Sequence, residues 1–180
     1  MIKNIALVAN CPVSHHSMGG GDRIMIEMAK YWQGQGGKTT LFGPPESESV
    51  SKLGELETQF VQTSNYSVER LGIARAYLGR IWASLKDTRQ QETFDLIYAA
   101  SEALPDIVLS LKLKRQNPKA RWIVGFFLKA KNPFRGEAPF NWKFFSLFLQ
   151  QQISFALMKF FRVNGIIYMG IEEESLLRSR

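Results

Sequence analysis

Short apolar runs alternate along this chain with longer segments in which apolar residues recur every three or four positions. The apolar runs are rich in Val, Ile and Phe and predict strands over residues 2–9, 38–43, 58–63, 96–99, 121–127 and 165–169. The periodic segments predict helices over residues 22–35, 67–86, 102–116 and 141–161, with a final turn from residue 172. Strands that alternate with helices favour a parallel sheet covered on both faces. The predicted fold class is therefore α/β.

Two segments have the composition of surface loops. Gly43 to Ser51 contains two prolines and three serines, and Lys129 to Pro139 contains two prolines and Gly136. Proline and glycine at this density interrupt regular structure, so we expect both segments to lie outside helices and strands.

The predicted helix of residues 141–161 is apolar around most of its circumference. Its polar positions form one narrow stripe at helical spacing, made of Lys143, Ser146, Gln150 and Ser154. The length is close to that of a membrane span, but Lys143, Lys159 and three consecutive glutamines argue against spanning. The wide apolar arc indicates either a helix packed in the core or a helix that lies at a membrane interface. The predicted helix of residues 67–86, with its basic residues around apolar ones, is a second candidate for membrane contact.

Size and composition are those of an ordinary folded domain. The chain has 180 residues, of which 45% are hydrophobic and 22% charged. This length suffices for one domain with a sizeable core, and this composition is that of a folded protein and not of a disordered one. The single cysteine, Cys11, excludes an internal disulfide, and no Cys/His cluster has zinc-ligand spacing. A reducing cytoplasm is the simplest compartment, and the short apolar start fits a first strand better than a signal peptide.

Charge is distributed unevenly along the chain. Residues 1–64 contain 5 basic and 6 acidic side chains, a net charge of −1, whereas residues 65–180 contain 18 basic and 10 acidic ones, a net charge of +8. A basic second half indicates an anionic partner, such as phospholipid, nucleic acid or a phosphorylated substrate. The same charge is equally compatible with solvated Lys and Arg on helix faces.

A glycine-rich loop separates the first predicted strand from the first predicted helix. Gly19, Gly20 and Gly21 stand directly before that helix. Glycine lets backbone N–H groups come close to a ligand, and a helix N-terminus favours an anion such as phosphate. Three glycines alone are a weak signal, because a simple turn uses them as well.

Two more specific phosphate-binding motifs do not fit. Residues 35–40 look like the end of a P-loop, but Trp32 stands where that motif requires glycine, and the segment follows a helix instead of a strand. The opening loop does not match the G-x-G-x-x-G pattern and is too long for the tight dinucleotide turn. We therefore do not expect NAD or FAD to bind.

Several polar residues follow predicted strands and so belong to the carboxyl edge of the sheet, where ligands bind in open α/β folds. His16 or Ser17 could contact a substrate hydroxyl there, or the two histidines could be a surface pair. Glu102 could contact a polar substrate, or it could open a helix that Pro105 helps to start. No Ser/His/Asp order indicates a catalytic triad.

Several short segments, taken together in their order and spacing, carry a family resemblance. They are residues 17–24 (Ser-Met-Gly-Gly-Gly-Asp-Arg-Ile), 38–43, 94–102, 118–124 and 132–134. The whole resembles the N-terminal half of a GT-B glycosyltransferase of the family-4 type, over nearly all of the chain.

The resemblance implies that residues 1–180 form one Rossmann-like domain, which binds the acceptor across a cleft from a second such domain. The second domain would bind the nucleotide-sugar donor, lies outside this chain, and would be needed for activity. The implied enzyme is a retaining hexosyltransferase without metal or other cofactor, acting on a cell-surface polysaccharide or glycolipid precursor. Gly19, Gly20 and Gly21 would match the loop that approaches the donor phosphates. The acceptor-side candidates are His16, Ser17, Ser101, Glu102 and Lys129.

The basic, Phe-rich second half suits an acceptor carried on a polyprenyl or phospholipid anchor, with an anionic membrane surface as a further candidate partner. The expected location is the cytoplasm, at the inner face of the cell membrane. A nucleic-acid partner is not expected, because the Phe residues follow core spacing and do not form an exposed platform.

One position departs from the family pattern. Many relatives end the strand equivalent to residues 121–127 with a histidine that reaches the transferred sugar, whereas this chain continues Phe126-Phe127-Leu128-Lys129. Either another side chain takes that role, or the activity is altered or absent. The alternative function is therefore a non-catalytic Rossmann-like binding module.

Overall fold

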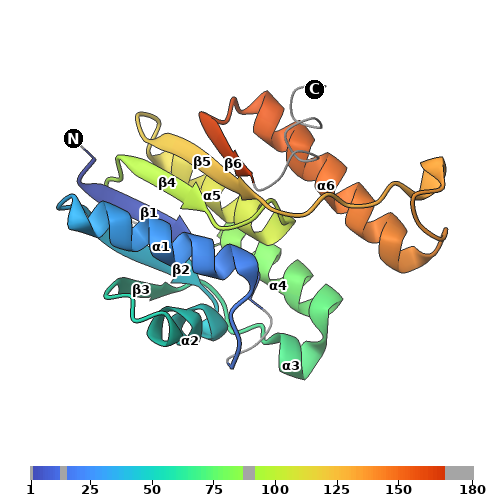
Figure 1. Cartoon of the computed structure of the whole chain (residues 1–180), viewed down its shortest axis with the longest axis horizontal. Helices are drawn as coiled ribbons and strands as arrows, with labels where there is room; N and C mark the ends of the chain where they lie inside the picture. Colours follow the sequence, from blue (N-terminus) through green and yellow to red (C-terminus); the bar gives the residue numbers. More distant parts are fainter. Residues whose placement is uncertain (1, 13–15, 87–91, 169–180) are drawn as a thin grey trace.

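The computed structural model describes residues 2–12, 16–86 and 92–168. In these residues, six strands form one sheet in which all neighbours are parallel, in the order β3-β2-β1-β4-β5-β6 (Figure 1). The strands are β1 (Asn4–Val8), β2 (Lys38–Gly43), β3 (Gln59–Gln62), β4 (Leu96–Ala99), β5 (Arg121–Phe126) and β6 (Gly165–Tyr168). The strand order reverses between β1 and β4.

Helices cover both faces of this sheet. They are α1 (Gly20–Gly34), α2 (Pro45–Leu53), α3 (Val68–Leu71), α4 (Ile73–Lys86), α5 (Leu104–Gln116), the 3-10 helix η1 (Pro133–Arg135) and α6 (Trp142–Phe160). Helices α1 and α2 pack on one face, and α5 and α6 pack on the other, with α4 against α5. The predicted α/β class, a Rossmann-like parallel sheet with helices on both faces, is confirmed.

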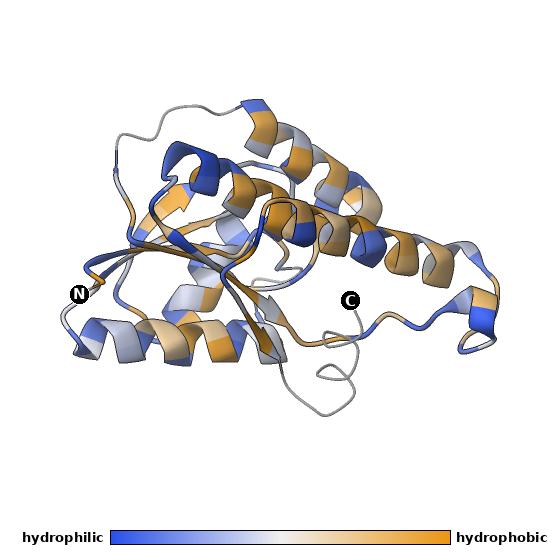
Figure 2. Cartoon of the chain, turned by 90° about the horizontal axis from the view of Figure 1, so that it is seen from above, coloured by the Kyte–Doolittle hydropathy of each residue, from blue (hydrophilic) through white to orange (hydrophobic). Residues whose placement is uncertain are grey.

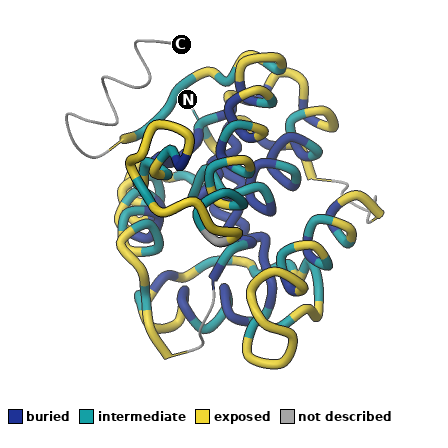
Figure 3. The backbone as a smooth tube through the Cα atoms, turned by 90° about the vertical axis from the view of Figure 1, so that its right-hand side faces the viewer, coloured by how far each residue is buried: buried dark blue, intermediate teal, exposed yellow. Residues whose placement is uncertain are grey.

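The core consists of two apolar layers, one on each face. Successive side chains of a strand point to opposite faces. In β1, Ala6 and Val8 therefore join the layer under α5 and α6, while Ile5 and Leu7 join the layer under α1 and α2. The indole of Trp122 is fully buried, and its N–H donates to Ser110 Oγ at 3.1 Å. Buried backbone runs through the middle of the molecule, with exposed turns outside it (Figure 3).

The expectation of a surface loop from Gly43 to Ser51 is wrong, because most of this segment is helix α2. Pro44 is the N-cap and Pro45 the first helical residue, a position where the missing proline N–H costs nothing. Ser47 and Ser51 are buried, and Ser47 Oγ donates to the carbonyl of Ala9. Polar composition therefore does not mark solvent exposure here.

The expectation of one helix over residues 67–86 is also wrong. Gly72 has a φ of 73° and separates α3 from α4. This left-handed conformation suits glycine, which has no Cβ to clash with the backbone. The short α3 therefore turns away from the axis of α4, as Figure 1 shows.

Two further boundaries differ from the expectations. Helix α1 begins at Gly20, so Gly20 and Gly21 form its first turn and are not part of the loop. Within the expected loop from Lys129 to Pro139, η1 forms a single turn, where Asn132 Oδ1 accepts from the N–H of Phe134 at 2.9 Å. The turn expected from residue 172 lies outside the described residues.

The two halves of helix α6 lie in different environments. Its second half packs into the core through Phe155 and Met158, as expected for a helix on the sheet. Its first half extends with η1 beyond the rest of the molecule (Figures 1 and 2). No helix of the described residues is both long enough and apolar enough to cross a membrane.

Candidate functional site

A pocket of about 260 Å³ opens at the carboxyl edge of the sheet, where β1 and β4 end side by side. Its walls come from the segments that follow these two strands and from the first turns of α1 and α5. The described residues that line it are Ala9, Cys11, Pro12, Ser17, Met18, Gly19, Gly21, Asp22, Ala100, Ser101 and Asp106. The strand order reverses between β1 and β4, which is where open α/β sheets bind ligands.

The N-terminus of α1 forms one wall of this pocket. The N–H of the N-cap, Gly19, donates to Asp22 Oδ2 at 2.8 Å. The N–H groups of Gly20 and Gly21 have no acceptor within the helix, as is general for a first helical turn. Gly20 is exposed, and among the described residues no atom outside its chain neighbours and its own helix backbone lies within 4 Å of a Cβ at this position. Packing in the described part of the chain therefore does not require glycine at position 20.

Asp106, in the first turn of α5, forms the floor of the pocket and is only 1% exposed. Its Oδ1 accepts from the backbone N–H of Asn10, and its Oδ2 accepts from the hydroxyl of Ser101, both at 2.5 Å. Burial raises the pKa of Asp106 to about 7, although both hydrogen bonds act to lower it. Near neutral pH this carboxyl group is therefore able either to accept or to donate a proton.

Two other titratable groups of the pocket are shifted in the same direction. Burial raises the pKa of Asp22, against the effect of the Gly19 hydrogen bond. Burial and the negative charge of Asp106 raise the pKa of the Cys11 thiol well above its usual range. Because the thiolate is the nucleophilic form of cysteine, Cys11 is poorly suited to covalent catalysis.

The side chain of Asn10 joins four parts of the fold behind the pocket. Its amide N–H group donates to Ser84 Oγ at 3.1 Å and to the carbonyl of Pro105 at 3.2 Å, and its Oδ1 accepts from Thr63 Oγ1 at 3.1 Å. Asn10 is fully buried. These bonds link the end of β1 to the segment after β3 and to α4 and α5, so the pocket floor is fixed before any ligand arrives.

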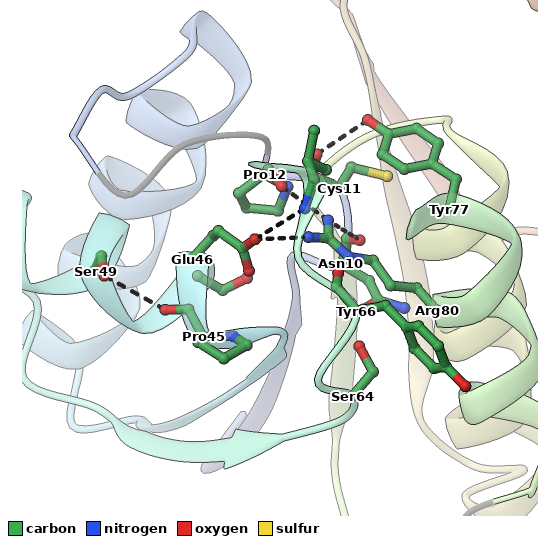
Figure 4. Close-up of polar contacts among 12 residues, drawn as sticks. Asn10, Cys11, Pro12, Pro45, Glu46, Ser49, Ser64, Tyr66, Tyr77 and Arg80 are labelled. Carbon is green, nitrogen blue, oxygen red and sulfur yellow. Dashed lines mark hydrogen bonds and ion pairs between the residues drawn. The ribbon is translucent and has the colours of Figure 1, made fainter. Parts of the chain in front are cut away.

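The buried guanidinium of Arg80 holds the segment that follows β1 (Figure 4). Its Nη1 donates to the carbonyls of Asn10 and Pro12, at 3.2 and 2.8 Å, and its Nε donates to the carbonyl of Tyr66 at 2.9 Å. Its Nη2 lies 3.1 Å from Glu46 Oε1, and neither side chain is exposed. One arginine on α4 thus fixes a pocket wall that contains no regular structure.

A phenyl ring lies beside the pocket at the end of β5. A Cβ at Gly21 would lie 3.1 Å from the Phe127 ring, and a Cβ at Gly125 only 2.6 Å from it. Glycine at these two positions therefore makes room for the ring. The N–H of Phe127 also donates to Glu102 Oε2 at 3.4 Å. An aromatic ring therefore occupies the strand end where the family resemblance leads one to expect histidine.

The structure brings four of the expected site residues together. Ser17, Gly19, Gly21 and Ser101 line the pocket. The other four expected residues lie around it and are not among the described residues that line it: Gly20, His16, Glu102 and Lys129. Gly20 and His16 are exposed, Glu102 is bonded to the end of β5, and Lys129 follows that strand half-buried.

The pocket suits a ligand that carries hydroxyl groups. Two carboxyl groups, from Asp22 and Asp106, and two hydroxyls, from Ser17 and Ser101, line it. Carboxylates accept hydrogen bonds from hydroxyls but repel a phosphate at short range. A phosphate is accommodated better outside the pocket, at the exposed amide of Gly20.

Sequence reasoning missed the residues that build the floor and wall. Asn10 follows the first strand and Asp106 starts the helix after the fourth, so their positions alone signal the carboxyl edge. Arg80 and Glu46 gave no such signal, because Arg80 looks like a basic side chain on the surface of an amphipathic helix and Glu46 like a charge in a polar loop. Only the folded chain pairs them across 34 residues of sequence.

No group of three or more His, Cys, Asp or Glu side chains that could hold a metal ion is found in residues 2–12, 16–86 and 92–168. No protein-family model matches the chain, and no curated protein matches it at a significant level.

Proposed function

We propose that this chain is the acceptor-binding domain of a retaining GT-B glycosyltransferase. The complete enzyme would transfer a sugar from a nucleotide-sugar donor to a cell-surface polysaccharide or glycolipid precursor. The observation that carries the proposal is the pocket lined by carboxyl and hydroxyl groups at the point where the strand order reverses, next to the helix α1 that begins with glycine.

The pocket supports the acceptor role because its polar groups match a sugar. The carboxyl group of Asp22 accepts from hydroxyls, and so do the lone pairs that Asp106 and Ser101 keep beyond their mutual hydrogen bond. Its volume of about 260 Å³ is small, which fits one terminal sugar residue of a longer acceptor better than a complete nucleotide.

The exposed glycine supports a role toward the donor. In the part of the chain that the structure describes, no neighbouring segment contacts a Cβ at Gly20, so packing there does not account for the glycine. A side chain would instead stand over first-turn N–H groups that have no helical acceptor. Those N–H groups would meet the donor pyrophosphate, presented by a second domain across the cleft.

One observation favours a second candidate function, a non-catalytic Rossmann-like binding module. The Phe127 ring lies against Gly21, at the strand end where the resemblance leads one to expect a histidine that reaches the transferred sugar. A phenyl ring cannot donate a hydrogen bond or carry a proton. A binding module would keep the sugar pocket without needing that histidine.

The experiment that separates the two functions is a sugar-transfer assay on the protein encoded by the complete gene, with Gly20→Val as the test variant. Removing one well-placed donor from an active site costs about a hundredfold in rate, and we expect a loss of that order. The matched control is Gly34→Val, in the last turn of α1, where a Cβ also meets no atom within 4 Å.

Circular dichroism and thermal melting show whether both variants fold. If the wild type transfers sugar and the rate falls in Gly20→Val but not in Gly34→Val, the result supports the glycosyltransferase. Transfer that survives Gly20→Val removes the proposed role of the glycine turn. A complete gene product that binds glycans but transfers no sugar from any nucleotide-sugar favours the binding module.

A further inference from the structure

Five aromatic side chains gather in η1, in the first half of α6 and in the segment between them, and we call this group the aromatic tip. It consists of Phe134, Phe140, Trp142, Phe145 and Phe148. Ring centroids lie 5.5 Å apart for Phe134 and Phe140, and 5.9 Å apart for Trp142 and Phe145. Despite these contacts Phe134 is 64% exposed, Phe140 69% and Trp142 78%. Exposed aromatic clusters of this kind mark an interaction surface.

The aromatic tip is separate from the two layers of the core. None of its five residues belongs to either core cluster of the described chain. The segment that carries it extends beyond the body in two perpendicular views (Figures 1 and 2). The rings pack on one another, so the cluster is ordered without being buried.

Polar contacts hold the tip in place against the end of β5. The side-chain amide of Gln151 donates to the carbonyl of Leu128 at 2.7 Å, and its oxygen accepts from the N–H of Ala130 at 3.0 Å. Asn141 caps α6 by accepting from the N–H of Phe144 at 3.1 Å. The tip is therefore preorganised, which lowers the entropic cost of docking.

The surroundings of the tip are positively charged. Residues 128–149 contain four basic side chains and one acidic side chain. Lys131 and Arg135 are exposed, and so is Leu128, with 71% of its surface accessible. Aromatic side chains flanked by Lys and Arg are the combination that binds at an anionic lipid surface, where rings enter the headgroup region and cations meet lipid phosphates.

We propose that the aromatic tip docks on an anionic lipid bilayer. Exposed rings of Phe134, Phe140 and Trp142 enter the interface, and Lys131 and Arg135 contact anionic headgroups. The tip follows β5 from the same edge of the sheet as the pocket. Docking would therefore bring the pocket edge to the membrane surface, where it could meet a lipid-linked acceptor. Only this last point, the use of the orientation for a lipid-linked acceptor, rests on the proposed function.

The test is flotation of the purified chain with vesicles of phosphatidylcholine containing 30% phosphatidylglycerol, compared with vesicles of phosphatidylcholine alone. Wild type is expected to float only with the anionic vesicles and to detach as salt is added. Replacing Phe134, Phe140 and Trp142 together with serine is expected to lower the partition coefficient by at least about 100-fold. Changing Lys131→Gln and Arg135→Gln together is expected to lower it by about 30-fold, since each charge is worth about fivefold.

A matched control uses exposed apolar side chains on a different helix, α4. Leu78→Ser with Trp82→Ser removes side chains that are 68% and 57% exposed, and it is expected to leave binding unchanged. Trp142 supplies a local readout, because its fluorescence should shift to the blue with anionic vesicles, and Trp142→Phe should lose that shift.

Several results would overturn the proposal. They are absence of binding to anionic vesicles, equal binding to neutral ones, retention of binding by the triple serine variant, and loss of binding in the α4 variant. A dimer in solution that the triple serine variant dissociates would also overturn it, because a second copy would then cover the tip. None of these measurements depends on sugar transfer, so the membrane proposal and the proposed function fail independently.

Discussion

Replacing Asp106 with asparagine removes one buried titratable group and should change how the stability of the chain depends on pH. The pKa of this carboxyl group is about 7 in the folded chain, against 3.8 without the fold. The folded state therefore keeps the proton over a pH range in which the unfolded state has lost it. Stability from this group is present at low pH and is lost as pH rises toward and through 7. Between pH 5 and pH 8 the loss amounts to about 2.5 kcal/mol.

Asparagine mimics the protonated carboxyl group closely. Its carbonyl can accept from the N–H of Asn10, and its amide can donate to Ser101 Oγ. The assay is urea denaturation of wild type and Asp106→Asn at pH 5, 6, 7 and 8. The stability of the variant relative to wild type is expected to rise by about 2.5 kcal/mol across this range. The Cys11 thiol, whose pKa is raised well above its usual range, titrates above this window.

The control for this experiment is Asp95→Asn. Asp95 is exposed, and the backbone N–H groups of Asn4 and Lys3 lower its pKa, so it stays ionised throughout the window. Its replacement should give the same stability difference at pH 5 and pH 8. Parallel pH profiles for wild type and Asp106→Asn would refute the reasoning, since they would mean that Asp106 does not carry a proton in the folded chain.

Two further substitutions test the support of the site and the break in the helix. Arg80→Met should lower the free energy of unfolding by about 3–5 kcal/mol, because the substitution leaves the Glu46 carboxylate buried without its partner. The measurement is urea denaturation, and the control is Arg75→Met, an exposed position on the same helix, which should change the free energy of unfolding little. Equal losses in the two variants would contradict the structural role of Arg80. Gly72→Ala should cost about 1 kcal/mol, because φ is 73° there. The measurement is thermal melting, and the control Gly34→Ala, at a position with negative φ, should not destabilise the chain. If Gly72→Ala has no effect on the melting temperature, the break between α3 and α4 does not need glycine.

Most of the fold follows from sequence patterns because the buried parallel strands are continuous apolar runs. Leu96–Ala99 is an example: every residue of β4 is buried, and the predicted bounds are those observed. Helix α2 was not predicted because its composition resembles that of a loop, although Glu46 and Ser47 are buried and bind polar partners from other segments. The break between α3 and α4 at Gly72 was not predicted, because the apolar periodicity continues across this residue. Only the positive φ of Gly72 shows that the helix is interrupted.

The candidate site was predictable as a location but only partly as chemistry. The glycines and Ser101 follow strands that turn out to be neighbours, so their meeting at one edge follows from parallel topology. The raised pKa of Asp106 depends on burial of its side chain in the folded chain, which no local pattern encodes. Besides Glu46, Arg80 binds three backbone carbonyl groups, which every residue type possesses, so the sequence does not indicate these partners.

The central claim, that the pocket holds the acceptor, is tested most directly by the steady-state kinetics of Ser101→Ala in the protein encoded by the complete gene. Loss of one hydroxyl contact should raise KM for the acceptor by about 2- to 10-fold, and KM for the nucleotide-sugar should stay unchanged. Ser49→Ala on α2, whose hydroxyl donates to Pro45 away from the pocket, should change neither value. A rise in KM for the donor alone, or no change in either KM, would contradict the assignment of the pocket to the acceptor.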